Sequence, residues 1–317
     1  MIATLTGLAL IAAAGGPARV SAEALPLAEG SPRLGCLAMT SAHSLSGGEG
    51  FGGYSGMVLD QEGGELLLLA DNGNLIRLSI TLGEDGAVTN VAGGTAFAIH
   101  DEQDRPLKKR NGDTEALTPW PGGYLITREA LDDALLIKEN GDHFAITETV
   151  ADLSGSDALR RNGGYEAASA LGEGRALFIS EGTFPTGEAA ITLFDGENVI
   201  DRGRYQPAED FAVTDIVADT KGDRLFAVER AFSPSLGPRT RLTVAPLSAA
   251  VDDDAATLIP VELGRLTLED GTDNMEGLAF YQSSDGGENL MIISDDNFNP
   301  IQRTVLMTFR LGDTCPL

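Results

Sequence analysis

The stretch DNMEGLAFYQSSDGGENLMIISDDNFNP, residues 273–300, decides the fold. It contains two short apolar runs, residues 278–280 and 290–293, on either side of a turn that carries two glycines. Apolar runs of this length bounded by turn residues predict two antiparallel strands. Acidic residues stand before the first run and after the second, although an unpaired charge at the end of a buried strand is costly. These carboxylates therefore need a partner.

The same pattern recurs along the chain. Stretches that begin at Tyr54, Asp113, Gly164 and Ala212 each contain an apolar strand, a turn, a second apolar strand and an acid at its end. The five repeats align at Ser55, Glu115, Glu166, Asp215 and Glu276. Their spacing of about 50 to 60 residues suits one four-stranded propeller blade per repeat, and no segment has the apolar period of a long helix. The sequence predicts an all-β propeller with five visible four-stranded blades, or six if one blade has lost its signature.

The two ends of the chain are expected to close this ring together. The last repeat supplies three strands, and residues 37–46 precede the first repeat without a blade of their own. If residues 37–46 pair as the missing fourth strand, antiparallel pairing places Cys36 beside Cys315. An even number of cysteines in an exported chain suggests a disulfide, and closing so long a loop stabilises by up to about 5 kcal/mol in the chain-entropy model.

The N-terminal residues have a different character from the rest. Residues 4–15 are mostly apolar, and Val20, Ser21 and Ala22 form a small-residue cleavage site. This pattern predicts a secretory signal peptide over residues 1–22, followed by one propeller domain over residues 23–317. Arginine outnumbers lysine, as in proteins from GC-rich bacterial genomes. We therefore expect the mature protein in a bacterial periplasm or outside the cell, without a membrane span.

The charge balance limits the partners. Lys and Arg total 22 against 48 Asp and Glu, which gives a formal net charge of −26. Nucleic acids and anionic membranes attract basic surfaces, so neither is an expected partner. Cations are the natural counterpart of this chain. We expect a monomer that binds a small-molecule substrate or ligand.

The repeated acids are predicted to meet around the propeller axis. Those near the first strand of a blade are Glu115, Glu166, Asp215 and Glu276, and those at the end of the second strand are Asp71, Glu129, Glu181, Glu229, Asp295 and Asp296. Like charges so close cannot all ionise without a counterion. Ca²⁺ accepts six to eight oxygen ligands at flexible geometry, and Mg²⁺ or Mn²⁺ are alternatives. The predicted ligands are Asp71, Glu115, Glu166, Glu181, Glu276 and Asp295. The alternative is that the acids pair with arginines or cap turns.

Several motifs resemble a known family. The segments NMEGLAF (274–280) and LMIISDDNFNPIQRTVLMTFRL (290–311) are similar to the C-terminal signature of the "esterase-like activity of phytase" family. YSGMVLD (54–60) with ELLLLADNG (65–73), and YEAASAL (165–171) with ALFISEG (176–182), resemble its opening and middle elements. Two departures are Ala167, where the family tends to have Gly, and Asp215 followed by Ile216, where it has Glu-Gly. The resemblance implies a propeller, export and hydrolysis of esters or phosphoesters.

Two main hypotheses about function follow. In the first, the chain is a Ca²⁺-dependent hydrolase of a phosphoester, ester or lactone, with Glu276, Glu166 and Glu115 as catalytic residues and Arg128, Arg230 and Arg303 as clamps for the substrate. In the second, the cation is structural and the propeller binds a small molecule or a protein without catalysis. A ring of fully paired acids without a metal is a third possibility. His43, His100 and His143 are scattered without zinc-site spacing, and no serine lies in a nucleophile elbow.

Overall fold

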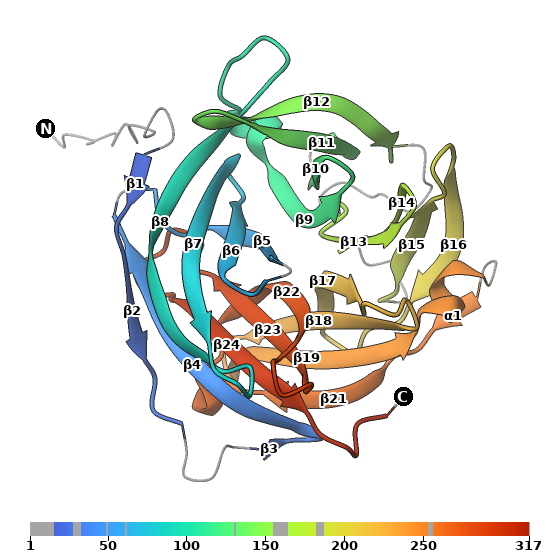
Figure 1. Ribbon diagram of the computed structural model, residues 1–317. Coiled ribbons are helices and arrows are strands. Elements are labelled where there is room, and N and C mark those ends of the chain that lie inside the picture. Colours follow the sequence, from blue (N-terminus) through green and yellow to red (C-terminus); the bar gives the residue numbers. More distant parts are fainter. Residues whose placement is uncertain are drawn as a thin grey trace, which may run out of the picture.

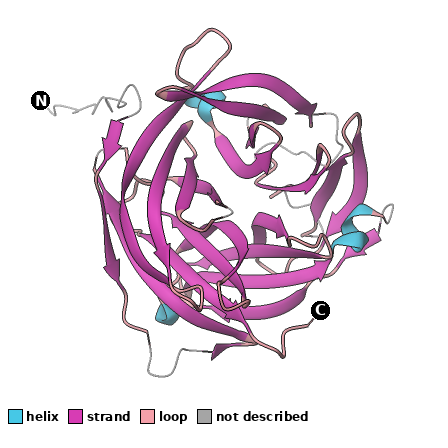
Figure 2. Cartoon of the chain, in the orientation of Figure 1, coloured by secondary structure: helices cyan, strands magenta, loops and turns pink. Residues whose placement is uncertain are grey.

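The computed structural model describes residues 16–27, 33–48, 50–60, 62–129, 131–154, 164–181, 187–252 and 256–316. Strands make up most of this chain (Figure 2), as predicted. The described helical segments are short: η1 (Lys109–Gly112), α1 (Leu247–Val251) and η2 (Leu268–Asp270). Within the described ranges, no helix is long and apolar enough to cross a membrane.

Twenty of the described strands pair into five antiparallel units of four, which we number as blades one to five. Blade one contains β5 (Tyr54–Leu59), β6 (Glu65–Ala70), β7 (Asn74–Leu82) and β8 (Val88–His100). Blade two contains β9 (Thr114–Trp120), β10 (Gly123–Arg128), β11 (Asp133–Asn140) and β12 (His143–Asp152). Blade three contains β13 (Ala167–Gly172), β14 (Arg175–Ile179), β15 (Ala189–Phe194) and β16 (Val199–Tyr205), extended by β20 (Ala256–Leu258).

The last two blades complete the ring. Blade four contains β17 (Ala212–Ala218), β18 (Arg224–Ser233), β19 (Gly237–Pro246) and β21 (Val261–Leu266). Blade five contains β22 (Asn274–Gln282), β23 (Glu288–Asp295), β24 (Thr304–Leu311) and β4 (Leu37–Gly47). The first strands contact one another in the order β5, β9, β13, β17, β22 and back to β5. They surround the centre in Figure 1, while β8, β12, β16, β21 and β4 lie at the perimeter.

The predicted closure of the ring is confirmed. β4 pairs antiparallel with β24, from Leu37 opposite Leu311 to Leu45 opposite Thr304. A disulfide joins Cys36 to Cys315 across 279 positions of sequence, and the short strand β3 (Arg33–Leu34) pairs with the start of β4. The two ends of the chain therefore share one blade.

The segment before β4 lies along the outside of the ring. β1 (Gly16–Ala18) pairs with β8, and β2 (Val20–Ala24) pairs with β4. The predicted signal peptide overlaps both strands, and its residues 1–15 lie outside the described part of the chain. The cleavage site near Ala22 stays a prediction.

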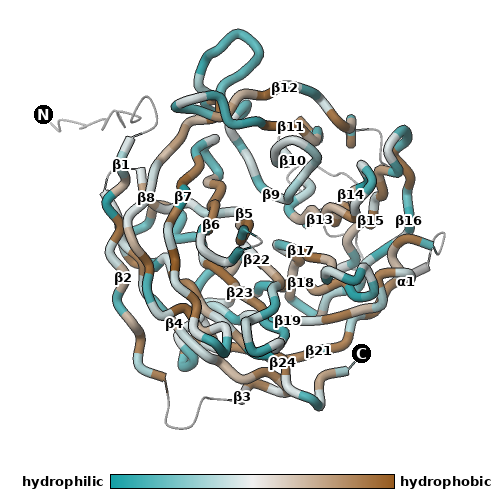
Figure 3. The backbone as a smooth tube through the Cα atoms, in the orientation of Figure 1, coloured by the Kyte–Doolittle hydropathy of each residue, from teal (hydrophilic) through white to brown (hydrophobic). Residues whose placement is uncertain are grey.

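The core lies between neighbouring blades. β6 is apolar after Glu65, β23 contains the apolar run 290–293, and both strands are buried along most of their length. Leu290, Ile292 and Phe226 belong to one cluster that joins blades four and five. Figure 3 shows the apolar residues on the sheet strands, whereas the loop that follows β8 is hydrophilic. Burial of both faces of each blade leaves the polar chemistry to the strand ends and loops.

Candidate functional site

A β-bulge interrupts the pairing near the start of the first strand in four of the five blades. The ladder between the first two strands shifts register around Ser55 in blade one, Glu115 in blade two and Glu276 in blade five. Glu166, directly before β13, occupies the corresponding position in blade three. Bulges insert an extra residue and re-aim its side chain, so three glutamates from three blades point to a shared centre.

A second set of acids comes from the end of the second strand. The backbone N–H groups of Asp71, Glu129 and Glu181 each donate to a carbonyl at the start of their own blade, at 2.8, 3.1 and 3.1 Å. Asp295 is the equivalent residue of blade five, where it lies opposite Asn274. The equivalent residue of blade four is Arg230, opposite Ala212. Four blades thus supply a carboxylate at this level, and blade four supplies a guanidinium.

The electrostatics show that the two sets of acids face each other. Burial, and then the charges of Glu166 and Glu276, raise the pKa of Glu115 well above its ordinary value. Burial also raises the pKa of Glu276 to about 8, although Arg230 opposes this shift. Burial and the charge of Asp295 raise the pKa of Asp71 to about 7. The six predicted ligands therefore come together, and burial with mutual repulsion raises the pKa of Glu115, Glu166 and Glu276 most strongly.

One side of this cluster has the donor set of a cation site. Asp113, Glu115 and Glu129 each direct a carboxylate oxygen to a common point, and these oxygens lie within 4.8 Å of one another. Burial raises the pKa of Asp113 and of Glu129. Neither residue is among the predicted ligands: Glu129 is one of the acids predicted at the end of a second strand, and Asp113 lies before the first strand of its blade, where no ligand is predicted.

The other side of the cluster is organised by Arg230. Its Nη2 lies 3.1 Å from Glu181 Oε1, and its Nε lies 3.3 Å from Glu276 Oε1. Its Nη1 donates to Asn274 Oδ1 at 2.9 Å, and Asn274 Nδ2 donates to Glu276 Oε1 at 2.7 Å. Arg230 is thus the one predicted clamp residue that lies within the carboxylate cluster.

Asp215 does not belong to the cluster, and the predicted alignment of blade four was wrong by one residue. The bulge falls at Thr214. Thr214 Oγ1 donates to the carbonyl of Met275 in the next blade at 2.9 Å, just as Ser55 Oγ donates to Thr114 at 2.8 Å. Asp215 is buried and accepts the backbone N–H groups of Ile216 and Leu278. It therefore joins blades four and five.

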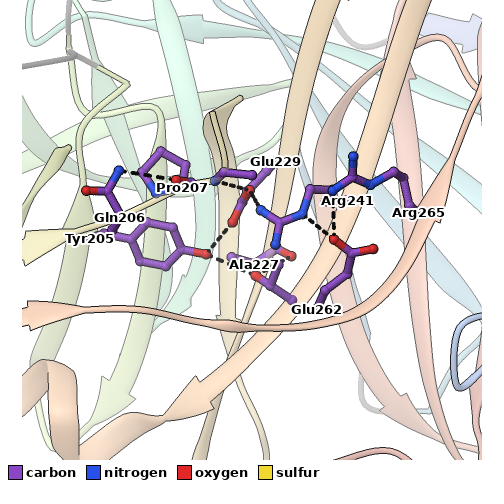
Figure 4. Close-up of polar contacts among 10 residues, drawn as sticks. Tyr205, Gln206, Pro207, Ala227, Glu229, Arg241, Glu262 and Arg265 are labelled. Atoms are coloured by element: carbon purple, nitrogen blue, oxygen red, sulfur yellow. Dashed lines mark hydrogen bonds and ion pairs between the residues drawn. The ribbon is translucent and has the colours of Figure 1, made fainter. Parts of the chain in front are cut away.

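Glu229 is likewise structural (Figure 4). Its side chain is fully buried and forms an ion pair with Arg241. Tyr205 Oη donates to Glu229 Oε1 at 2.9 Å, and Arg241 Nε also contacts Glu262 at 2.7 Å. The alternative of acids paired with arginine thus holds at this position.

The other two predicted clamps, Arg128 and Arg303, contact partners outside the carboxylate cluster, and their role in substrate binding stays a prediction. Arg128 binds Asp133 on the neighbouring strand, with Nε 2.9 Å from Asp133 Oδ1. Arg303 is half-exposed, and its backbone N–H and Nη2 contact Asp273 and Gly271 at 3.1 and 3.3 Å. Both arginines neutralise or cap their own surroundings instead of facing the cluster.

Asp296 is a positioning residue. Its Oδ1 accepts the backbone N–H of Gly53 at 3.0 Å, and its Oδ2 accepts Thr304 Oγ1 at 3.1 Å. Gly53 has φ +68, and a Cβ there would meet the Phe298 ring at 2.3 Å. Because the Gly53 carbonyl in turn accepts the N–H of Asp71, Asp296 fixes the junction between blades five and one.

The comparison with protein families matches this architecture. The family model described as phytase-like, esterase-like activity of phytase, matches residues 49–298. The chain belongs to the phytase-like family. No curated protein matches this phytase-like chain.

Two solved structures are similar in outline to the phytase-like chain. A chain of the nidogen/laminin complex has 9% sequence identity and a TM-score of 0.43, with 87% of this chain and 88% of that chain covered. The tail fiber of Staphylococcus aureus phage P68 has 10% identity and a TM-score of 0.39, with 88% and 53% covered.

The phytase-like match covers every residue of the carboxylate cluster. It includes the bulge glutamates and the SDDN segment, residues 294–297, that supplies Asp295 and Asp296. Asn297 and Phe298 both have φ near +50, at 49 and 48. Asn299 N–H donates to the Asp296 carbonyl at 2.7 Å, which makes this a type I′ turn. This tight turn begins at Asp296 and directly follows Asp295.

Proposed function

We propose that this phytase-like propeller is an exported, Ca²⁺-dependent hydrolase that acts on an ester or lactone at its central axis. The convergence of carboxylates from four blades, with Arg230 as their close cationic neighbour, carries this proposal. Such an arrangement concentrates buried negative charge far beyond what one guanidinium balances. Strongly perturbed carboxyl groups at one site are typical of functional sites.

The residues present fit a hard divalent cation. Every candidate ligand is a carboxylate oxygen, the ligand type that Ca²⁺ prefers. Asp113, Glu115 and Glu129 converge within 4.8 Å, and Asp71, Glu166 and Asp295 adjoin them electrostatically. The proposed cation site is therefore centred on blade two, with acids of blades one, three and five beside it.

Side chains of the protein supply the other catalytic roles. A bound Ca²⁺ ion supplies positive charge that polarises a carbonyl oxygen. Glu276, oriented by Asn274 and Arg230, accepts a proton from the attacking water, and its raised pKa suits a base at neutral to alkaline pH. Arg230 stabilises negative charge on the substrate. Burial and the charges of Glu181 and Glu276 raise the pKa of Glu166, and Arg230 opposes this shift.

The surroundings of the cluster favour a substrate with an apolar part. Phe232 and Leu236 in the β18–β19 hairpin are 72% and 59% exposed, and Ile301 in the β23–β24 loop is 88% exposed. Both loops extend from the strand ends that carry Arg230 and Asp295. The chain has only four lysines. A compact, apolar ester or lactone suits this site better than a highly charged phosphate such as phytate.

The disulfide bond supports export of the protein. The Cys36–Cys315 disulfide requires an oxidising compartment to persist. Together with the signal-like residues 1–22, it favours the periplasm or the extracellular medium. We propose a monomer, because the ring is closed within one chain.

Hydrolysis assays test the proposal. Wild-type protein is incubated with an aryl ester, an aliphatic lactone and an aryl phosphate, in EDTA and after Ca²⁺ is restored. We expect Ca²⁺-dependent turnover of the ester or lactone, and a loss of about 10²- to 10⁴-fold in Glu276→Gln, the range typical of a general base. Glu197→Gln, in an exposed turn of blade three, is the matched control. Turnover unaffected by EDTA, or none above buffer, contradicts the proposal.

The second candidate is a non-catalytic propeller with a structural cation. The engagement of Glu181 and Glu276 by Arg230 favours it, because these acids are already partly neutralised. This function predicts that Ca²⁺ raises the melting temperature while none of the three substrate classes is hydrolysed.

A further inference from the structure

Two of the three histidines meet at the junction between blades one and two. His100 ends β8 and His143 begins β12, and these outer strands pair in parallel, with His100 opposite Ala145 and Ile99 opposite Phe144. The two imidazole rings lie with centroids 4.1 Å apart and planes 19° from parallel. The prediction that the histidines are scattered was therefore wrong for this pair, because only the pairing between blades brings them together.

An acidic side chain from a preformed loop faces both rings. Asp104 Oδ1 lies 2.9 Å from His100 Nδ1 and 3.4 Å from His143 Nε2. The loop, seen beyond β8 in Figure 1, is held by Asp101, which accepts the backbone N–H groups of Gln103 and Arg105. Asp104 itself has φ +58, a conformation uncommon for residues other than glycine. The side chain of Asp104 is 78% exposed, so the site is open to solvent.

The other contacts of His143 prepare it to bind a metal. His143 Nδ1 lies 3.1 Å from Asp142 Oδ1. A carboxylate only accepts hydrogen bonds, so Nδ1 carries the hydrogen and Nε2 keeps its lone pair. A carboxylate on the far nitrogen is the usual second partner of a metal-binding histidine. This lone pair faces the oxygen of Asp104, and among the described side chains Asn140 Nδ2 donates to it at 3.2 Å.

We propose that His100, His143 and Asp104 form a binding site for Zn²⁺ or a similar transition metal that clamps blade one to blade two. Zn²⁺ binds two imidazole nitrogens and a carboxylate oxygen with bonds of about 2.0–2.2 Å, which separates tetrahedral ligands by about 3.3–3.5 Å. The distances to Asp104 are close to this range. Nitrogen ligands distinguish this site from the all-oxygen cluster at the axis, which suits Ca²⁺.

Binding changes the geometry in one defined way. A metal lies in the plane of each imidazole that binds it, so two nearly parallel rings must tilt apart to share one ion. His143 is hydrogen-bonded to Asp142 and Asn140. Among the described side chains, His100 is hydrogen-bonded to Asp104. His100 is therefore the ring that turns, and its ring hydrogen resides on Nε2 when Nδ1 binds the ion.

Zinc titration of the full chain tests this proposal. Calorimetry is performed with Zn²⁺ in excess Ca²⁺, which occupies the carboxylate cluster at the axis. We expect one Zn²⁺ per chain with micromolar affinity, lost in His100→Gln and His143→Gln. Asp142→Asn should weaken binding by about 10-fold or more, as is typical for the outer partner of a ligating histidine. Asp195→Asn, which removes one exposed carboxylate from blade three, should leave the affinity unchanged.

Cobalt provides a second readout that depends on the ligand type. Co²⁺ bound by two imidazoles in a four- or five-coordinate site gives visible absorption bands, and Zn²⁺ should abolish them by competition. His43 remains in both histidine variants, on β4 in blade five. Zn²⁺ binding of equal strength in wild type and in the double variant His100→Gln/His143→Gln overturns the proposal, as does the absence of binding below the millimolar range.

Discussion

Metal-free protein should lose stability as the pH rises, and Glu276→Gln should remove much of this loss. Burial raises the pKa of Glu276 from 4.5 to about 8. Between these values the unfolded chain releases the proton while the folded chain keeps it. The folded state then binds more protons, so its stability falls as pH rises through this window, and the penalty is complete above about pH 8.

The magnitude follows from the two pKa values. At about 1.4 kcal/mol per pH unit, a rise from 4.5 to about 8 corresponds to as much as about 5 kcal/mol at alkaline pH. Glutamine mimics the protonated acid and keeps the acceptor for Asn274 Nδ2. We therefore expect Glu276→Gln in EDTA to match wild type near pH 4 and to exceed its stability at pH 9, by up to this amount.

Urea denaturation at pH 4, 6.5 and 9 measures the effect, in EDTA and in Ca²⁺. Calcium should restore the alkaline stability of wild type, because the ion balances the charge of the neighbouring carboxylates. Glu197→Gln, which removes an exposed carboxylate, should follow the wild-type profile. A wild-type stability that rises with pH in EDTA, or a pH profile that Glu276→Gln leaves unchanged, would refute the reasoning.

Three further predictions concern the scaffold. Replacement of Cys36 and Cys315 by serine should lower the free energy of unfolding by about 4–5 kcal/mol in the chain-entropy model, as measured by urea denaturation. An equal fall when the wild-type disulfide is reduced would confirm that the disulfide is the source of this stability, and no change would contradict it. Gly53→Ala should lower both the melting temperature and the Ca²⁺ affinity, because the added Cβ meets the Phe298 ring. Gly222→Ala is the control, because Gly222 has φ +72 and open space around it, so this variant measures only the cost of the backbone conformation. Equal effects of the two variants would show that the ring contact is unimportant. Glu229→Gln should cost about 3–5 kcal/mol, since it breaks a buried ion pair, yet leave Ca²⁺ affinity unchanged in calorimetry; weaker Ca²⁺ binding would place Glu229 in the site after all.

The fold could be predicted because its signals are local. Two apolar runs and a turn predict each blade from the sequence. The pattern is clearest around β23, whose end carries the residues SDDN. The closure followed from residues 37–46, which had no other strand to pair with, and from two cysteines at the right ends. Short-range patterning and simple counting were sufficient for these features.

The site could be predicted only in part, because its details depend on register and on distant partners. The bulge in blade four selects Thr214 over Asp215 by one position of pairing with β18, which the sequence does not reveal. Glu229 has a structural role because Tyr205 and Arg241, on other strands, contact its carboxylate. Asp113 and the two stacked histidines likewise become visible only when neighbouring strands and blades are assembled.

Calcium titration most directly tests the claim that the carboxylate cluster at the axis binds a cation. Calorimetry is performed on wild type and on the triple variant Asp113→Asn/Glu115→Gln/Glu129→Gln, which removes the converging oxygens. The control removes the same charge from three exposed positions, Glu148→Gln/Glu197→Gln/Glu209→Gln. The account predicts saturable Ca²⁺ binding in wild type and control, and its loss in the first variant. Absence of binding in wild type, or equal binding in all three proteins, would contradict it.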